Sequence, residues 1–159
     1  MSQLSYNQYQ DAALAGMKAD IGNDDVMSLK AEEALLDGHL CVIGTSELQG
    51  KLPAAAADIT NIQKFGGVVV RSLAREMNAA GAANYGIGEM APAMKKGRIW
   101  VVVETAIVVG TSTVNVRYAG VGQKGAFRAD AVSSETAVLP NARWVKGTAG
   151  AGLALLELI

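Results

Sequence analysis

Residues that could perform chemistry are scarce in this sequence. It has one cysteine, Cys41, and one histidine, His39, in 159 residues. A single cysteine forms no intramolecular disulfide and no multi-cysteine metal site, and a single histidine cannot supply the several ligands of a cupin-type metal centre. A serine or cysteine triad also needs a base beside its nucleophile. We therefore expect no cofactor, no metal and no enzyme activity.

His39 and Cys41 are the one pair of residues for which a Cys-His site has to be considered. They lie two positions apart on an expected strand, 39–43, and therefore share a face of it. That placement is compatible with a Cys-His pair, but the sequence supplies no neighbouring acid to orient the imidazole. We favour the interpretation of Cys41 as a small buried hydrophobe and of His39 as a structural residue.

Excess charge and long apolar runs are also missing. The formal net charge is -1, the sequence pI is about 5.8, and no stretch of about 18 apolar residues occurs. The chain therefore lacks the basic field typical of nucleic-acid binding and a polybasic membrane patch. The N-terminus has no basic leader followed by an apolar segment. We expect no nucleic acid, no membrane, and a protein that stays in the cytoplasm where it is made.

The apolar content lies mostly in alanine and valine, and several runs of β-branched residues indicate strands. Residues 98–104 are rich in β-branched and aromatic side chains. The runs 107–109 and 114–118 flank a polar turn, 110–113, and predict a hairpin whose second arm alternates between a buried and a wet face. Residues 90–94 predict an edge strand, because Pro92 cannot donate to a ladder, joined to 98–104 by a turn.

The remaining strand candidates are short and separated by glycine, proline and asparagine. They are residues 39–43, 68–70, 125–129, 137–139, 142–145 and 153–159. Residues 28–36 fit a helix or an extended segment equally, 51–63 predict mostly loop, and 72–80 predict a short helix. Many short strands without long helices predict an all-β fold, a small antiparallel β-barrel or jelly-roll-like sandwich with at most one or two short helices.

The N-terminal residues differ from the rest in composition. Residues 1–25 are mainly polar or small, with too few apolar side chains to offset the entropy of ordering. We expect an extended N-terminal arm at 1–25 and a single β-barrel-like domain at 26–159.

Three patterns resemble functional sites without fulfilling their requirements. Residues 120–125 match the spacing GxGxxG, but a dinucleotide loop must open a helix and the continuation has no helical periodicity. The acidic residues near 24–25 and 32–33 lack the spacing of a calcium loop. Arg71, with residues 75 and 76, predicts an exposed charged face.

The two tryptophans are assigned different roles. We expect Trp100 in the core, because it lies in the 98–104 run, and we expect Arg143 and Trp144, beside a Pro-Asn turn, at a contact surface. Apolar residues of the arm complete the set of candidate partner contacts: Leu4, Tyr6, Tyr9, Leu14, Met17, Arg143 and Trp144.

From about Gly66 onward the sequence resembles the capsid cement, or head decoration, proteins of tailed bacteriophages. The segments that carry the resemblance are GGVVVRSLARE, the aromatic-plus-GE step at 85–89, MKKGRIWVVVE, VNVRY, GAFR and the ending LPNARWVKGTAGAGLALLELI. The resemblance implies a virion structural protein on the capsid exterior, a homo-oligomer (dimer or trimer) that bridges copies of the major capsid protein. A carbohydrate-binding β-sandwich module and a small cupin-like enzyme are the alternatives.

Overall fold

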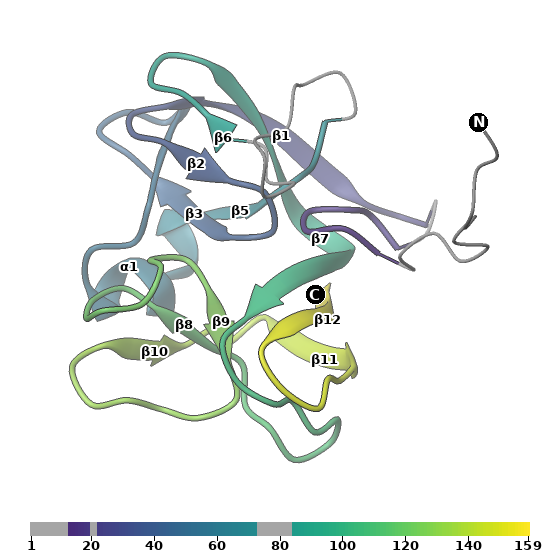
Figure 1. Ribbon diagram of the computed structural model, residues 1–159. Coiled ribbons are helices and arrows are strands. Elements are labelled where there is room, and N and C mark those ends of the chain that lie inside the picture. Colours follow the sequence, from purple (N-terminus) through teal and green to yellow (C-terminus); the bar gives the residue numbers. More distant parts are fainter. Residues whose placement is uncertain (1–12, 20–21, 73–83) are drawn as a thin grey trace, which may run out of the picture.

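The computed structural model of this protein describes residues 13–19, 22–72 and 84–159, and strands dominate it (Figure 1). The strands are β1 (Asp25–Ala31), β2 (Leu35–Leu36), β3 (Leu40–Ile43), β4 (Gln49–Lys51), β5 (Phe65–Val69), β6 (Asn84–Tyr85), β7 (Met90–Val103), β8 (Asn115–Arg117), β9 (Phe127–Arg128), β10 (Thr136–Val138), β11 (Ala142–Lys146) and β12 (Gly152–Leu158). Within this part of the chain the helices are α1 (Ala56–Thr60) and the 3₁₀ turn η1 (Ile62–Lys64). The expected all-β class with one or two short helices is confirmed.

The long strand β7 organises the molecule because it belongs to two sheets. Its first half pairs with β1 and β5, and the order β1-β4-β3-β5-β7 closes into a barrel when β7 pairs with β1. Its second half pairs with β12 and β9 in a second sheet, whose order is β11-β12-β7-β9-β8-β10. Figure 1 shows β7 running from the barrel at the top into the second sheet below.

The predicted turn at 95–97 is wrong, because β7 continues through it. Gly97 lies where β7 changes partners and has φ +120, a conformation that favours glycine and bends the strand without reversing it. The assignment of 90–94 to an edge is also wrong. Pro92 lies between β1 and β5, opposite Ser28, and its carbonyl accepts a hydrogen bond from the Val70 N–H.

The predicted hairpin over 107–118 is wrong as well. Ile107 makes a single bridge to Thr148, and β8 pairs with β9 and β10 instead of with the 107–109 segment. The expected wet face of β8 is buried, since Asn115 is 0% exposed and Arg117 is 6% exposed. Tertiary contacts explain this burial. The loop 120–125 covers Arg117, which pairs with Glu104 and Glu135, and the Asn115 amide donates to Thr113 and to the Ala129 carbonyl.

The apolar side chains form two cores. One fills the barrel, and the larger one lies between the barrel and the second sheet. Successive residues of a strand point to opposite faces, so Leu40 and Val42 of β3 join the larger core while Cys41 joins the barrel core. Strands β3 and β5 are therefore buried on both faces.

Most of the other strand predictions are confirmed with small shifts in their ends. Strands β3, β9, β10, β11 and β12 begin and end within two residues of the predicted segments, and β5 begins three residues earlier than predicted. The segment 28–36, which the sequence left open, is extended as the end of β1 and β2. The predicted helix at 72–80 falls almost wholly outside the described residues.

The described part of the N-terminal segment lies against the body. The N–H groups of Gly16 and Ala19 donate to the carbonyls of Trp100 and Arg98, at 2.8 and 3.0 Å. Gly16 has φ +75, and a Cβ there would lie 2.8 Å from the backbone of Arg71. Residues 13–19 are thus hydrogen-bonded to β7. The extended N-terminal arm expected at 1–25 stays a prediction, and its residues 1–12, 20 and 21 lie outside the described part.

Candidate functional site

The residues considered first for chemistry have separate structural roles. The Cys41 thiol is fully buried and donates to the Gly67 carbonyl (3.4 Å), and burial raises its pKa to about 12. The His39 ring lies 3.0 Å from the Asp37 carbonyl, and burial lowers the pKa of His39. A thiol that stays protonated is a poor nucleophile.

The GxGxxG segment is a loop that folds over a cluster of ion pairs. The Arg117 guanidinium bonds to Glu104 (2.9 Å) and to Glu135, and Glu104 also pairs with Arg128 (3.3 Å). Burial alone would lower the pKa of Arg117, but its bonds to Glu135 and Glu104 raise it. A Cβ at Gly122 would collide with Glu104 and Arg117. Gly120 and Gly122 are needed for close approach to this cluster, and the segment leads into β9 instead of a helix.

The other charged groups singled out from the sequence are used internally. The Glu32 and Glu33 carboxylates accept the N–H groups of Thr45 and Leu52, at 2.6 and 2.7 Å. The expectation that Arg71 is exposed is wrong, because its side chain is 4% exposed and lies 3.7 Å from the Asp37 carboxylate. Among the described residues no group of three or more His, Cys, Asp or Glu side chains could hold a metal ion.

The two tryptophans have exchanged the roles expected for them. Trp144 is 6% exposed, its Nε1 donates to the Thr113 carbonyl (3.1 Å), and its ring meets Phe127 edge-on with centroids 6.3 Å apart. Trp144 is therefore a core residue and no surface contact. Trp100 is half-buried, with the Lys146 ammonium 5.6 Å from its ring centroid.

The register of β7, β12 and β11 explains this exchange. Ile99, Val101 and Val103 point inward, so the alternate residues Trp100 and Val102 point to the outer face of the second sheet. In β12, Leu153 and Leu155 lie opposite Val102 and Trp100 and are likewise half-buried. The bulge between Trp144 and Lys146 in β11 lets Trp144 turn inward while Lys146 pairs with Leu155.

Charged side chains surround this half-buried apolar group. Arg98, Glu157 and Arg143 form one row across the three strands, and Glu157 pairs with both arginines. The bonds from Arg143 and Arg98 hold the pKa of Glu157 below its usual range. With Lys146 on Trp100, cations outnumber carboxylates here. We call the outer side of β7, β12 and β11 the basic face; its members are Lys96, Arg98, Trp100, Val102, Arg143, Lys146, Leu153, Leu155 and Glu157.

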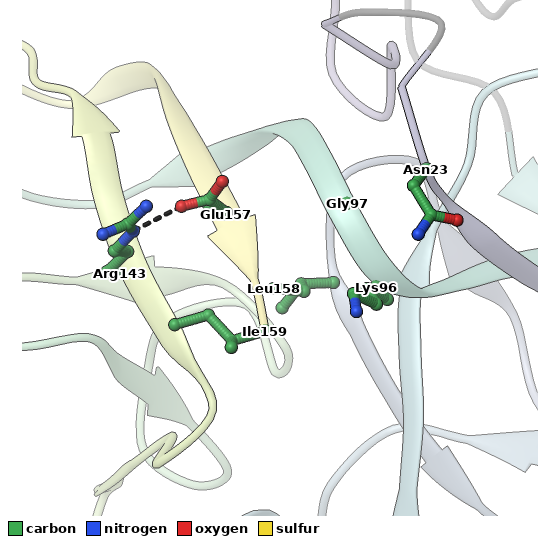
Figure 2. Close-up of a pocket in the computed structure, with 7 residues that line it drawn as sticks. All are labelled: Asn23, Lys96, Gly97, Arg143, Glu157, Leu158 and Ile159. Carbon is green, nitrogen blue, oxygen red and sulfur yellow. Dashed lines mark hydrogen bonds and ion pairs between the residues drawn. The ribbon is translucent and has the colours of Figure 1, made fainter.

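A pocket of about 300 Å³ opens beside the basic face (Figure 2). In Figure 2 the Arg143–Glu157 pair lies on one side, Lys96 and Asn23 lie on the other, and Leu158 and Ile159 lie between them. The pocket thus lies between the N-terminal segment, the middle of β7 and the last strand. It is open, and its lining mixes charged and apolar side chains.

Three of the predicted partner contacts, Leu14, Met17 and Arg143, are described and have exposed side chains, and their role as contacts stays a prediction. Leu14 and Met17 are 36% and 38% exposed on the segment that pairs with β7, and the Arg143 side chain is 65% exposed. Residues 4, 6 and 9 lie outside the described part. Trp100, Leu153 and Leu155 were not expected at the surface, although the alternation of side chains along their strands was an available signal.

No helix in the described segments is long and apolar enough to cross a membrane. The described residues thus form a closed barrel and a second sheet, and the outer side of the second sheet carries the basic face.

Comparison with known proteins gives the family. The family of structural cement proteins (E217 gp24/Pam3 gp6) matches residues 2–159, and the chain belongs to it. This is a family of phage structural proteins, which is not an enzyme class, and it makes the chain a component of the virion.

Two solved structures share the fold at low sequence identity. A chain of the capsid of Myoviridae phage XM1 superimposes with a TM-score of 0.72 and 15% identity, over 96% of this chain and 94% of that one. The N base of head fiber gp8.5 of bacteriophage phi29 gives 0.52 and 11%, over 86% and 95%. No curated protein sequence matches.

Proposed function

We propose that this protein binds the outer surface of the phage head through the basic face and bridges neighbouring major capsid protein subunits. The observation that carries the proposal is the composition of that face. Trp100, Leu153 and Leu155 offer apolar area at its centre, and cations surround them. An apolar centre with a charged rim is the usual anatomy of a protein interface.

The chemistry of the face indicates that of its partner surface. Lys96, Arg98, Arg143 and Lys146 outnumber Glu157, so the matching capsid surface should carry exposed carboxylates around an apolar patch. Glu157 holds two of the arginines in place, which lowers the entropy lost on binding. Leu14 and Met17, on the segment that pairs with β7, extend the contact toward a second capsid subunit.

The test uses heads assembled without this protein and measures co-sedimentation of the added purified chain. We expect Trp100→Ala to weaken binding by roughly 30-fold, as loss of a central aromatic anchor does. Arg143→Glu should weaken binding by about tenfold, because it places a carboxylate against an acidic surface.

Lys124→Glu is the matched control, because it makes the same kind of charge reversal at an exposed residue of the glycine-rich loop, away from the face. It should bind heads as the unmodified chain does. Equal effects of Arg143→Glu and Lys124→Glu, in variants with unchanged melting temperatures, would mean that another surface attaches the protein.

A further inference from the structure

The second sheet ends in a strand that has one free edge. Among the residues that the structure describes, β11 pairs with β12 alone, and it is the last strand in the order β11-β12-β7-β9-β8-β10. An edge strand presents a row of backbone N–H and C=O groups to which another extended segment can pair. The free edge of β11 is therefore a place where a partner can extend the second sheet.

The register of β11 and β12 shows which backbone groups are already used. The Ile159 N–H donates to the Asn141 carbonyl at 3.0 Å. In an antiparallel ladder every second pair of residues is hydrogen-bonded. Two residues further along, the pair of Arg143 with Glu157 is therefore bonded in the same way.

The residues that alternate with these bonded pairs turn their backbone groups outward. The N–H and C=O groups of Ala142 and Trp144 point away from β12, toward the free edge. Neither residue makes a backbone hydrogen bond to any described residue outside the pairing of β11 with β12. These two residues supply the donors and acceptors for an added strand.

A hollow of about 420 Å³ lies along this edge. It is lined by residues 142–144 of β11, by residues of the loop 109–114 and by residues 138–140 at the end of β10. Two of its apolar side chains, Val109 and Val138, are 47% and 48% exposed. The hydrogen bond from Trp144 Nε1 to the Thr113 carbonyl links β11 to the loop and fixes the hollow beside the edge.

Cations lie on the outer side of the same strand. Arg143 and Lys146 are exposed members of the basic face. The Arg143 guanidinium bonds to Glu157 through Nε, and its terminal nitrogens make no hydrogen bond or ion pair with the described residues. The outer side of the edge therefore favours carboxylates, whereas the hollow favours apolar side chains.

We propose that the free edge of β11 binds an extended, antiparallel segment of a partner protein in which apolar and acidic side chains alternate. The apolar side chains point the same way as Trp144, into the hollow, and the acidic ones lie beside Arg143 and Lys146. Hydrogen bonds to the outward backbone groups supply affinity, and the alternation of the side chains supplies specificity.

The role of this contact rests on the proposed function, because a strand added to β11 enlarges the basic face by one strand. The partner segment then belongs to the capsid protein that the face binds. A short segment that becomes ordered on binding loses conformational entropy, so we expect the isolated contact to have a dissociation constant of about 0.1–1 mM. Such a contact is measurable without any head.

Fluorescence anisotropy of a labelled peptide, Thr-Val-Glu-Val-Glu-Val-Thr, titrated with the full chain tests the proposal. In the antiparallel register the valine N–H groups face β11, because residues opposite Trp144 share its inward direction. N-methylation of the valines should therefore abolish binding, and N-methylation of the glutamates should leave the dissociation constant unchanged. A peptide with lysine in place of glutamate should bind more weakly by about tenfold or more.

Variants of the chain test the same edge from the other side. Ala142→Pro removes one outward N–H, and proline is tolerated in an edge strand where the N–H faces solvent. It should weaken peptide binding by about fivefold, as loss of one hydrogen bond does. Arg143→Glu should weaken it by about tenfold. Lys124→Glu, at an exposed residue away from the edge, is the control and should bind the peptide as the unmodified chain does.

Equal binding of the two N-methylated peptides, or a larger loss with the methylated glutamates, would overturn the proposal. So would an Ala142→Pro variant with an unchanged melting temperature that binds the peptide normally. If this variant does not fold, the two methylated peptides decide the matter. Peptide binding by a chain that does not bind heads would reject the proposed function and leave this contact standing, and head binding without peptide binding would do the reverse.

Discussion

Replacing each tryptophan in turn gives the sharpest test of the packing described here. Trp144→Ala removes a side chain that buries about 150–250 Å², which at about 25 cal/mol per Å² corresponds to about 4–6 kcal/mol of transfer free energy. It also removes the hydrogen bond to Thr113 and the edge-on contact with Phe127. Measured losses for such truncations are about 3–5 kcal/mol, and we expect a value in that range.

Trp100→Ala should cost much less. Trp100 is half-buried on the basic face, so it loses less apolar burial together with a cation–π contact with Lys146 of about 0.5–1 kcal/mol. We expect a total of about 1–2 kcal/mol. The sequence alone predicts the opposite order, because Trp100 lies in the most strand-like run of the chain.

Urea denaturation followed by far-UV circular dichroism measures the free energy of unfolding of both variants. This signal does not depend on the tryptophan that each variant loses. Trp144→Phe keeps most of the apolar volume and should cost about 1–2 kcal/mol, which gives a measurable value if the alanine variant does not fold. Iodide should quench the remaining tryptophan of the Trp144 variant strongly and that of the Trp100 variant weakly. A loss for Trp100→Ala equal to or above that for Trp144→Ala would refute the assignment of the two faces.

Three further outcomes can be checked on the isolated protein. Gly122→Ala should lower the free energy of unfolding by about 1–3 kcal/mol because its Cβ displaces the buried ion pairs, whereas Gly150→Ala, with open space around it, should change it by less than about 0.5 kcal/mol; both are read by urea denaturation. Cys41 should resist a disulfide reagent at pH 8 until the protein unfolds, and rapid labelling of the native protein would contradict its burial. The raised pKa of the Cys41 thiol contributes stability that is present below about pH 8.5 and declines as the pH rises toward 12. The hydrogen bond from Lys64 lowers the pKa of Asp58, and the N–H groups of residues 54 and 55 add to this effect. The stability that ionised Asp58 contributes is therefore present above about pH 4 and is lost as the pH falls through the lowered pKa. Asp58→Asn should reduce the pH dependence of unfolding below pH 4, and an unchanged dependence would count against this contribution of Asp58.

Several strands could be predicted from the local sequence alone. The runs around Leu40, Val68 and Leu156 are strands in the structure because β-branched and apolar residues between glycine and proline punctuation encode extended backbone locally. Cys41 and His39, the two residues that the sequence put forward as a pair, have separate hydrogen-bond partners in the structure. These are properties of short segments and of composition.

The pairing of the strands and the exposure of their side chains could not be predicted from the local sequence. Gly97 predicts a turn as readily as a bend, and only the partners on each side of β7 keep the strand continuous. The hairpin expected at 107–118 failed because hydrogen bonds to β9 and β10 replace the nearest neighbour in sequence. Local propensity contains no information about such distant partners.

Sequence by itself determined that this chain is an all-β protein, and its resemblance to phage cement proteins agrees with the family that the comparisons give. Only the tertiary structure decided which side chains face water. Lys96, Arg98, Arg143 and Lys146 are separated in a chain of near-zero net charge, and the register of three strands gathers them around Trp100. A face of a sheet consists of alternate residues from strands distant in sequence, so its composition depends on pairing and register.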